Sequence, residues 1–202
     1  MKTSTLVSAL AFAAMSVAGS AHATVIDFSD LNNNRLVVPL TVPSYLEDGF
    51  KVTAHGLFAS LVATSNLNWF QYAGSTAVAG TFGSVIELQR ADGGAFNFNS
   101  IDLIKLSRLN VGGNSVTFTG TFASGGTITQ DATFGKNFSF TNTAFSGFTN
   151  LKSVTWQEDR NLARDFQFDN INVSAVPEPG SYAMLAAGLG LLAFVSRRKK
   201  AA

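Results

Sequence analysis

The segment Ser115–Phe122, with the sequence SVTFTGTF, decides the fold class of this chain. Val116, Phe118 and Phe122 fall on one face of an extended strand, and the threonines between them fall on the other. A period of two with one apolar face is typical of a half-buried β-strand. The sequence Ser124-Gly125-Gly126 follows, and its glycines tolerate the positive φ of a tight turn. The segment is therefore predicted to be a strand that leads into a hairpin.

Similar extended segments recur along the chain between glycine-rich turns such as Asp92-Gly93-Gly94 and Gly112-Gly113-Asn114. This spacing predicts an all-β fold, an antiparallel β-sandwich or barrel, of which the sandwich is preferred. Ile101–Leu109 is ambiguous, because its apolar residues fit a strand poorly and a short helix moderately. Thr141–Asn150 is polar and is predicted to be a long loop. The predicted strands are Thr24–Phe28, Arg35–Val42, Gly49–Ala54, Leu57–Ala63, Val85–Gln89, Ala95–Asn99, Ser115–Phe122, Thr127–Phe134, Leu151–Gln157 and Asp165–Val173.

The last of these segments breaks its own alternation. Phe166 and Phe168 are even-numbered, whereas Ile171 and Val173 are odd-numbered, so the apolar set changes face across Asp169-Asn170. A shift by one residue predicts a β-bulge or a strand that passes from one sheet to the other.

The composition excludes several classes of protein. The chain has 202 residues, 46% of them hydrophobic, and no cysteine, which excludes a disulfide scaffold, thiol catalysis and cysteine-bound metals. Between residues 24 and 175, 9 lysines and arginines face 12 aspartates and glutamates, a net charge of −3. A mildly acidic domain argues against nucleic acid as a partner. Sixteen of the 18 phenylalanines lie in this part, so they are predicted to form the core.

The N-terminus is typical of a secretory signal peptide over residues 1–23. Lys2 precedes an apolar run. Ala21 and Ala23 occupy the two positions at which signal peptidase requires a small residue. Cleavage is predicted after Ala23. The alternative is a buried helix of the domain, but the run has no polar face.

The C-terminus has the parts of a membrane segment in order. Pro177-Glu178-Pro179 is an extended break, and residues 182–195 form an uncharged apolar stretch. As a helix this stretch is about 21 Å long, against a hydrocarbon core of about 30 Å. Arg197, Arg198, Lys199 and Lys200 would stay on the cytoplasmic side and place the preceding chain outside. The alternative is a core helix with a basic tail.

This order of Pro-Glu-Pro, apolar helix and basic cluster resembles the PEP-CTERM sorting signal of exported bacterial proteins, over residues 176–202. The resemblance implies that exosortase, a membrane-embedded transpeptidase, recognises Pro177, Glu178 and Pro179 and cuts near them. The chain would then be a substrate and not an enzyme. It divides into a signal peptide (1–23), a β-sandwich domain (24–175) and a sorting signal (176–202).

Both ends of the domain resemble exported jelly-roll modules: the opening TVIDF at Thr24–Phe28, with Gly49-Phe50, and the closing FQFDNINV at Phe166–Val173. Some sugar-binding jelly rolls hold a structural calcium ion between their first and last strands, so the resemblance implies Asp27 and Asp169 as ligands. Calcium needs more oxygen ligands than these two. The alternative is that Asp169 and Asn170 cap a bulge through local hydrogen bonds.

Catalytic groups are sparse. His55 is the one histidine left after predicted cleavage, it falls in a turn, and the chain contains no G-x-S-x-G motif. The acid pairs Glu47-Asp48 and Glu158-Asp159 are adjacent in sequence, so their side chains would point apart on a strand. No catalytic residue or cofactor other than calcium is predicted.

Aromatic residues beside amides offer a binding function instead. Trp69 and Tyr72 lie in the polar stretch SNLNWFQY, and Trp156 precedes Gln157. Such side chains could stack on a sugar and bond its hydroxyls; the alternative is that both tryptophans belong to the core.

The sequence therefore predicts a non-enzymatic exported protein of the cell envelope or extracellular matrix. It would be held briefly in the inner membrane by its C-terminal helix, with signal peptidase and exosortase as processing enzymes and a polysaccharide as a weak ligand. The alternatives are a secreted glycan-active hydrolase and a permanently anchored adhesion domain.

Overall fold

A computed structural model describes residues 23–32, 40–64, 71–81, 83–110, 114–157, 165–177, 186–190 and 192. The chain divides into two compact units. One is Ala23–Val176, and the other combines Met1–His22 with Pro177–Ala202.

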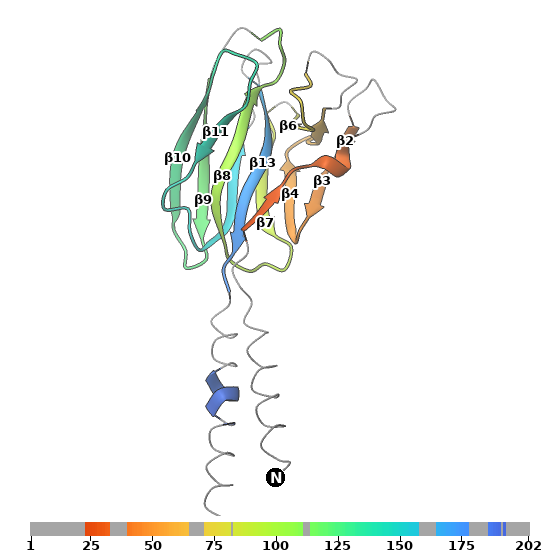
Figure 1. The fold of residues 1–202 in the computed structure, drawn as a ribbon. Coiled ribbons are helices and arrows are strands. Elements are labelled where there is room, and N and C mark those ends of the chain that lie inside the picture. The colour runs from red at the N-terminus through yellow and green to blue at the C-terminus, as the bar shows by residue number, and fades with distance from the viewer. Residues whose placement is uncertain are drawn as a thin grey trace, which may run out of the picture. The chain divides into compact units, whose positions relative to one another are not determined.

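The first unit is built from strands, in agreement with the all-β prediction (Figure 1). One 3-10 helix, η1 (Ser29–Leu31), follows the first strand among the described residues. The strands are β1 (Ala23–Ile26), β2 (Leu40–Val42), β3 (Ser44–Glu47), β4 (Phe50–His55), β5 (Leu61–Ala63), β6 (Val78–Gly80), β7 (Val85–Arg90), β8 (Phe96–Lys105), β9 (Asn114–Phe122), β10 (Thr127–Phe134), β11 (Thr141–Ala144), β12 (Leu151–Gln157) and β13 (Phe166–Ala175).

The strands form an antiparallel sandwich of two layers. One layer runs β10-β9-β12-β7-β4-β3, and the other runs β2-β5-β6-β13-β8-β11, with β1 also paired to β13. A single pair, Leu151 with Phe96, joins β12 to β8 and so links the two layers at a corner. In Figure 1, β10 and β9 lie on the left and β4 and β3 on the right.

A chain of aromatic rings fills the space between the layers. Phe118 on β9 contacts Phe98 on β8 and Trp156 on β12, with ring centroids 5.9 and 5.2 Å apart. Trp156 meets Phe168 on β13 edge-on at 5.0 Å, and Phe168 meets Phe28 at 5.7 Å. Burying rings of this size contributes roughly 1.5–3 kcal/mol each. Phe98, Phe118 and Phe168, which were among the phenylalanines predicted as core, therefore connect both layers, whereas the prediction is wrong for the exposed Phe58.

The predicted irregularity in the last strand is confirmed. The pairing of β13 with β8 shifts between Asp169 and Asn172, and Asn170 has a positive φ of 48°. The extra residue lets Phe166 and Phe168 before the bulge, and Ile171 and Val173 after it, all point into the core.

Three predicted elements need correction. Residues up to Lys105 of the ambiguous segment Ile101–Leu109 continue β8, because pairing with β13 and β11 outweighs a weak helical pattern. The predicted strand Leu57–Ala63 begins only at Leu61, since residues 56–59 form a turn. The predicted loop Thr141–Asn150 contains β11.

In the second unit, residues 186–190 and 192 are helical. No helix among the described residues is both long enough and apolar enough to cross a membrane. The predicted signal peptide, apart from Ala23, and most of the predicted helix 182–195 lie outside the described residues.

Candidate functional site

Trp156 is a core residue and not a surface platform for a sugar. Its side chain is 2% exposed and lies between Phe118 and Phe168. A ring covered in this way cannot stack on a glycan, so the alternative interpretation of Trp156 is the correct one. Trp69 lies outside the described residues, and its predicted role stays a prediction.

Tyr72 belongs to a loop that is tied to the outer face of β13. Its hydroxyl donates to the carbonyl of Gly74 at 2.9 Å, and its own carbonyl accepts from Arg108 at 3.3 Å. The buried side chain of Gln167 donates to the carbonyl of Gln71 at 2.8 Å and accepts from the hydroxyl of Thr64 at 3.0 Å. The loop that follows the Trp69 segment is therefore held by a polar side chain of the sheet.

Asp169 provides a second attachment for this loop. Its side chain is fully buried, accepts a hydrogen bond from the Ser75 hydroxyl, and accepts another from the backbone N–H of Asn170 at 2.7 Å. Burial raises the pKa of Asp169 to about 7, and the charges of Asp102 and Asp27 add to this effect. The bond to Asn170 is the local cap that the sequence offered as an alternative.

The calcium hypothesis gains no support from this geometry. Asp27 accepts from the N–H of Ser29 at 2.9 Å, and this hydrogen bond is the main cause of its lowered pKa. Asp169 already uses both oxygens as acceptors. No group of three or more histidine, cysteine, aspartate or glutamate side chains is placed to hold a metal ion within the described ranges. Calcium needs six to eight oxygen ligands, and the role of Asp27 and Asp169 as calcium ligands stays a prediction.

The groups considered for catalysis do not converge. His55 ends β4, and its Nε2 lies 3.0 Å from a carboxylate oxygen of Glu87 on the neighbouring β7. Glu47 accepts from the N–H of Phe28 at 3.2 Å, whereas Asp48 lies in the turn between β3 and β4. Glu158 and Asp159 lie outside the described residues.

Among the described residues, the most exposed large apolar side chains belong to a turn within the predicted strand Leu57–Ala63. Leu57 and Phe58, which we call the apolar tip, are 88% and 89% exposed. Phe58 has a φ of +60°, at the third position of a turn closed by the N–H of Ala59 and the carbonyl of Gly56 at 3.4 Å. A turn with positive φ at this position normally has glycine or asparagine there.

The apolar tip rests on a fixed base. The hydroxyl of Thr81 accepts from the N–H of Ser60 at 3.0 Å and donates to the carbonyl of Phe58 at 3.3 Å. The N–H of Thr81 in turn donates to the carbonyl of Ser60 at 2.9 Å. These bonds hold the backbone of the tip while its two side chains remain in solvent. The signal available from the sequence was the apolar pair directly after His55-Gly56.

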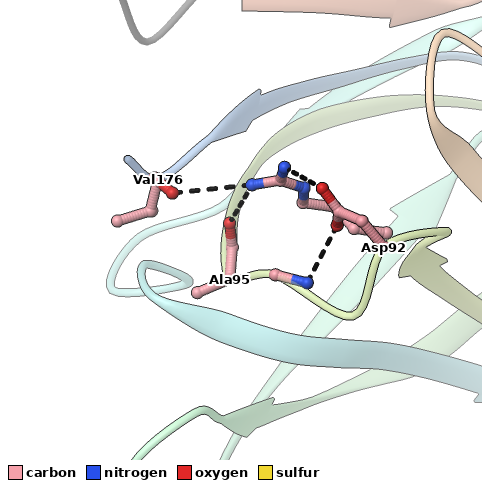
Figure 2. Close-up of polar contacts among 5 residues, drawn as sticks. Asp92, Ala95 and Val176 are labelled. Carbon is pink, nitrogen blue, oxygen red and sulfur yellow. Dashed lines mark hydrogen bonds and ion pairs between the residues drawn. The ribbon is translucent and has the colours of Figure 1, made fainter. Parts of the chain in front are cut away.

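Arg90 fastens the end of the last strand. The N–H of Val176 donates to the carbonyl of Ala95 at 2.9 Å. One guanidinium nitrogen of Arg90 donates to the carbonyls of Ala95 at 3.1 Å and Val176 at 3.5 Å (Figure 2). The other terminal nitrogen pairs with Asp92. We call this set of contacts among Arg90, Asp92, Ala95 and Val176 the exit clamp.

The turn between β7 and β8 is shaped to hold this arginine. Asp92 accepts from the N–H of Gly94 at 2.9 Å, and this bond, together with Arg90, holds the pKa of Asp92 below its usual value. A Cβ at Gly94 would lie 2.9 Å from the guanidinium carbon of Arg90. A side chain at this position would therefore displace the guanidinium from its place over the backbone.

The start of the domain lies beside its exit. Ala23, the residue predicted to precede the signal-peptidase cut, is the first residue of β1 and pairs with Ser174 near the end of β13. Ala21, the other predicted recognition residue, lies outside the described part of the chain, as do Glu178, Pro179 and the cluster Arg197, Arg198, Lys199 and Lys200. Pro177 is the first residue after the exit clamp.

Comparison with known families identifies the segment that begins here. Residues 175–200 match the family described as the PEP-CTERM protein-sorting motif. The chain carries a PEP-CTERM sorting signal. This finding confirms the resemblance drawn from Pro177-Glu178-Pro179 and marks the chain as an exported, envelope-associated protein that exosortase processes. No curated protein is similar to the sequence.

Solved structures similar to this PEP-CTERM protein include carbohydrate-binding modules. A mutant of the family 29 module CBM29-2, complexed with mannohexaose, has 14% identity over 78% of this chain and 93% of its own, with a TM-score of 0.43. The family 32 module of C. perfringens NanJ, in complex with galactose, has 12% identity over 69% of this chain and 100% of its own, with a TM-score of 0.37. Likenesses this distant carry no argument about a ligand of this chain.

Proposed function

We propose that this protein is a non-enzymatic, glycan-binding component of the cell envelope or extracellular matrix, delivered by its PEP-CTERM signal. The β-sandwich is the delivered part, and signal peptidase removes the N-terminal segment after Ala23. The C-terminal helix holds the chain in the inner membrane, with its basic end in the cytoplasm, until exosortase cuts near Pro177-Glu178-Pro179. The ligand is a neutral polysaccharide.

One observation carries the glycan-binding part of this proposal, namely the exposure of Phe58 in a costly backbone conformation. A bulky residue in the left-handed region is a genuine outlier, and such strain clusters where a protein binds or acts. Phe28 has a similar φ of 56°, but its ring is buried in the core, whereas the ring of Phe58 lies in solvent. Retaining a phenylalanine, with its ring in water, is explained when the ring contacts a ligand.

The chemistry of the apolar tip suits a sugar. A pyranose ring presents a face of C–H groups that packs on the flat face of an aromatic ring, while its hydroxyls point outward to polar groups. The pair His55 and Glu87 adjoins the tip at the end of β4 and offers both donors and acceptors. A single ring with a few hydrogen-bonding groups supports weak binding, which becomes useful when a polymer engages many copies.

Charge disfavours a lipid surface as the alternative. Residues 55–60 contain no lysine or arginine, and the domain from 24 to 175 has a net charge of −3. Peripheral binding to membranes usually joins apolar insertion to cationic contacts with anionic lipids. The apolar tip could supply the apolar insertion, but an acidic domain does not supply the cationic contacts.

The proposal is tested by co-sedimentation and affinity electrophoresis of the full-length protein with neutral polysaccharides. Phe58→Ala should weaken binding by about tenfold or more, the equivalent of about 1.4 kcal/mol. The matched control is Leu46→Ala, which removes another exposed apolar side chain (62% exposed) on β3. Equal binding by both variants would contradict the proposal. If wild-type protein bound anionic vesicles and Phe58→Ala abolished that binding, a lipid partner would be favoured instead.

Trp69 and Tyr72 remain further candidates for the same function. Their contribution is measured with Trp69→Ala and Tyr72→Ala in the same binding assay. Hydrolysis of envelope polysaccharides by the wild-type protein, lost in Glu158→Gln, would show that the protein is an enzyme.

A further inference from the structure

The exit clamp ends at the residue where the sorting motif begins. The N–H of Val176 donates to Ala95 and its carbonyl accepts from Arg90, so both backbone groups of Val176 are engaged. Pro177 has no N–H, and none of the hydrogen bonds found among the described residues involves it. The backbone thus changes from paired to unpaired between Val176 and Pro177, at the first residue of Pro177-Glu178-Pro179.

A processing enzyme needs a substrate backbone whose N–H and C=O groups are not already hydrogen-bonded. Proteases and transpeptidases bind their substrates as extended strands through main-chain hydrogen bonds, which requires substrate N–H and C=O groups that are not already paired. Residues held in β13 or in the exit clamp cannot offer these groups unless the strand frays. Strand ends fray readily because they have few neighbours.

Arg90 opposes this fraying at the place where it would begin. Its side chain is 18% exposed, it is held by the ion pair with Asp92, and it reaches the carbonyls of both Ala95 and Val176. The bond to Ala95, at 3.1 Å, has the usual length of an N–H···O hydrogen bond, and the contact with Val176, at 3.5 Å, is longer and weaker. Arg90 lies on β7, in the layer opposite β13, so it fastens the end of β13 to a different part of the sandwich.

We propose that Arg90 is a positioning residue for C-terminal processing: through Ala95 and Val176, the exit clamp sets the N-terminal limit of the segment that exosortase can bind. The clamp keeps the domain folded through Val176, and Pro177 is the first residue beyond it. Arg90 does not touch the reacting bond, and it acts by fixing where the accessible chain begins. This inference rests on the sorting part of the proposed function and is independent of glycan binding.

The decisive comparison uses the full-length protein in a host that contains exosortase, with the C-terminus of the mature product determined by intact mass. Wild-type protein should give one C-terminus at or after Pro177. Arg90→Met keeps much of the side-chain volume and removes every donor, so it should add products that end before Val176. Arg90→Lys retains a charged donor group without the planar fork of the guanidinium, and should restore the single product in part. The control is Arg108→Ala, which removes an arginine that stacks on Phe138 at 4.4 Å, away from the exit.

Hydrogen exchange on the same full-length proteins in detergent supplies a readout that does not depend on exosortase. The amide of Val176 should exchange about tenfold faster in Arg90→Met than in wild-type protein, from the loss of a charged hydrogen bond. Gly94→Ala is the second variant in case Arg90→Met fails to fold, because its Cβ would displace the guanidinium while keeping the arginine. It should shift the products and the exchange rate in the same direction.

An unchanged C-terminus together with unchanged exchange at Val176 in both variants would overturn the inference. Wild-type protein that is not cut near the motif at all would overturn the sorting part of the proposed function. Loss of glycan binding in Phe58→Ala bears on neither result.

Discussion

Removal of the Phe118 ring tests the claim that a chain of aromatic contacts holds the two layers together. Phe118 is fully buried and contacts Phe98, Phe145 and Trp156, with ring centroids 5.9, 4.9 and 5.2 Å away. Phe118→Ala loses this buried area and leaves a cavity between the layers, which costs about 3–5 kcal/mol. For a domain of this size, each kcal/mol lowers Tm by roughly 2–4 °C. The expected decrease in Tm is therefore roughly 6–20 °C.

The measurement is urea unfolding and thermal unfolding of the full-length protein in non-ionic detergent, followed by near-ultraviolet circular dichroism. Leu46→Ala, in an exposed position of β3, should change stability by less than about 0.5 kcal/mol. A loss below about 1 kcal/mol in Phe118→Ala, with an unchanged urea dependence, would refute the reasoning. It would mean that the aromatic chain is not the main link between the layers.

Three further variants test other parts of the account. Phe58→Gly should leave the free energy of unfolding within about 1 kcal/mol of wild type, because glycine accepts the φ of +60°, while polysaccharide binding is lost. Asp169 has a pKa of about 7 when folded against 3.8 in the unfolded chain, so the unfolded chain alone releases this proton between about pH 4 and 7. Stability should therefore fall over that range, by on the order of 4 kcal/mol from this group, and urea midpoints at both pH values should show a smaller fall in Asp169→Asn. Gly120→Ala should cost about 1–3 kcal/mol by urea unfolding, because its Cβ would lie 3.0 Å from Leu151 and 3.1 Å from Phe148; an unchanged midpoint would show that these side chains move aside freely.

The sequence predicted those features of the fold that depend on local periodicity. The alternation in Ser115–Phe122 predicts β9, where Val116 and Phe118 are buried and Thr117 is exposed. The change of parity after Phe168 predicts the bulge at Asp169-Asn170. In each case the two faces of a strand must differ in polarity, and the sequence records that difference directly.

Features that depend on contacts distant in sequence could not be predicted. Trp156 lies among polar neighbours in sequence, but β9 and β13 bring Phe118 and Phe168 against its ring. Asp169 becomes fully buried because the loop containing Ser75, 94 residues away, covers it. The apolar neighbours of Phe58 predict a strand, whereas the hydrogen bonds of Ser60 and Phe58 to Thr81 fix a turn.

The positions of the exit clamp and the apolar tip connect processing with binding. Both lie at the ends of β7 and its neighbour β4. Arg90, the last residue of β7, pairs with Phe50, and Val85, the first, pairs with His55, two residues before the tip. Five residue steps of about 3.4 Å separate these ends by about 17 Å. A domain attached through the chain that leaves at Val176 therefore presents Phe58 at its opposite end. Because one end of the sandwich carries both Ala23 and Val176, the two predicted cuts leave the turns at the other end untouched. A variant without the exit clamp, whose product is shortened, should therefore bind polysaccharide through Phe58 as well as wild-type protein does. If such a variant also lost polysaccharide binding, the two ends would be coupled through the sandwich.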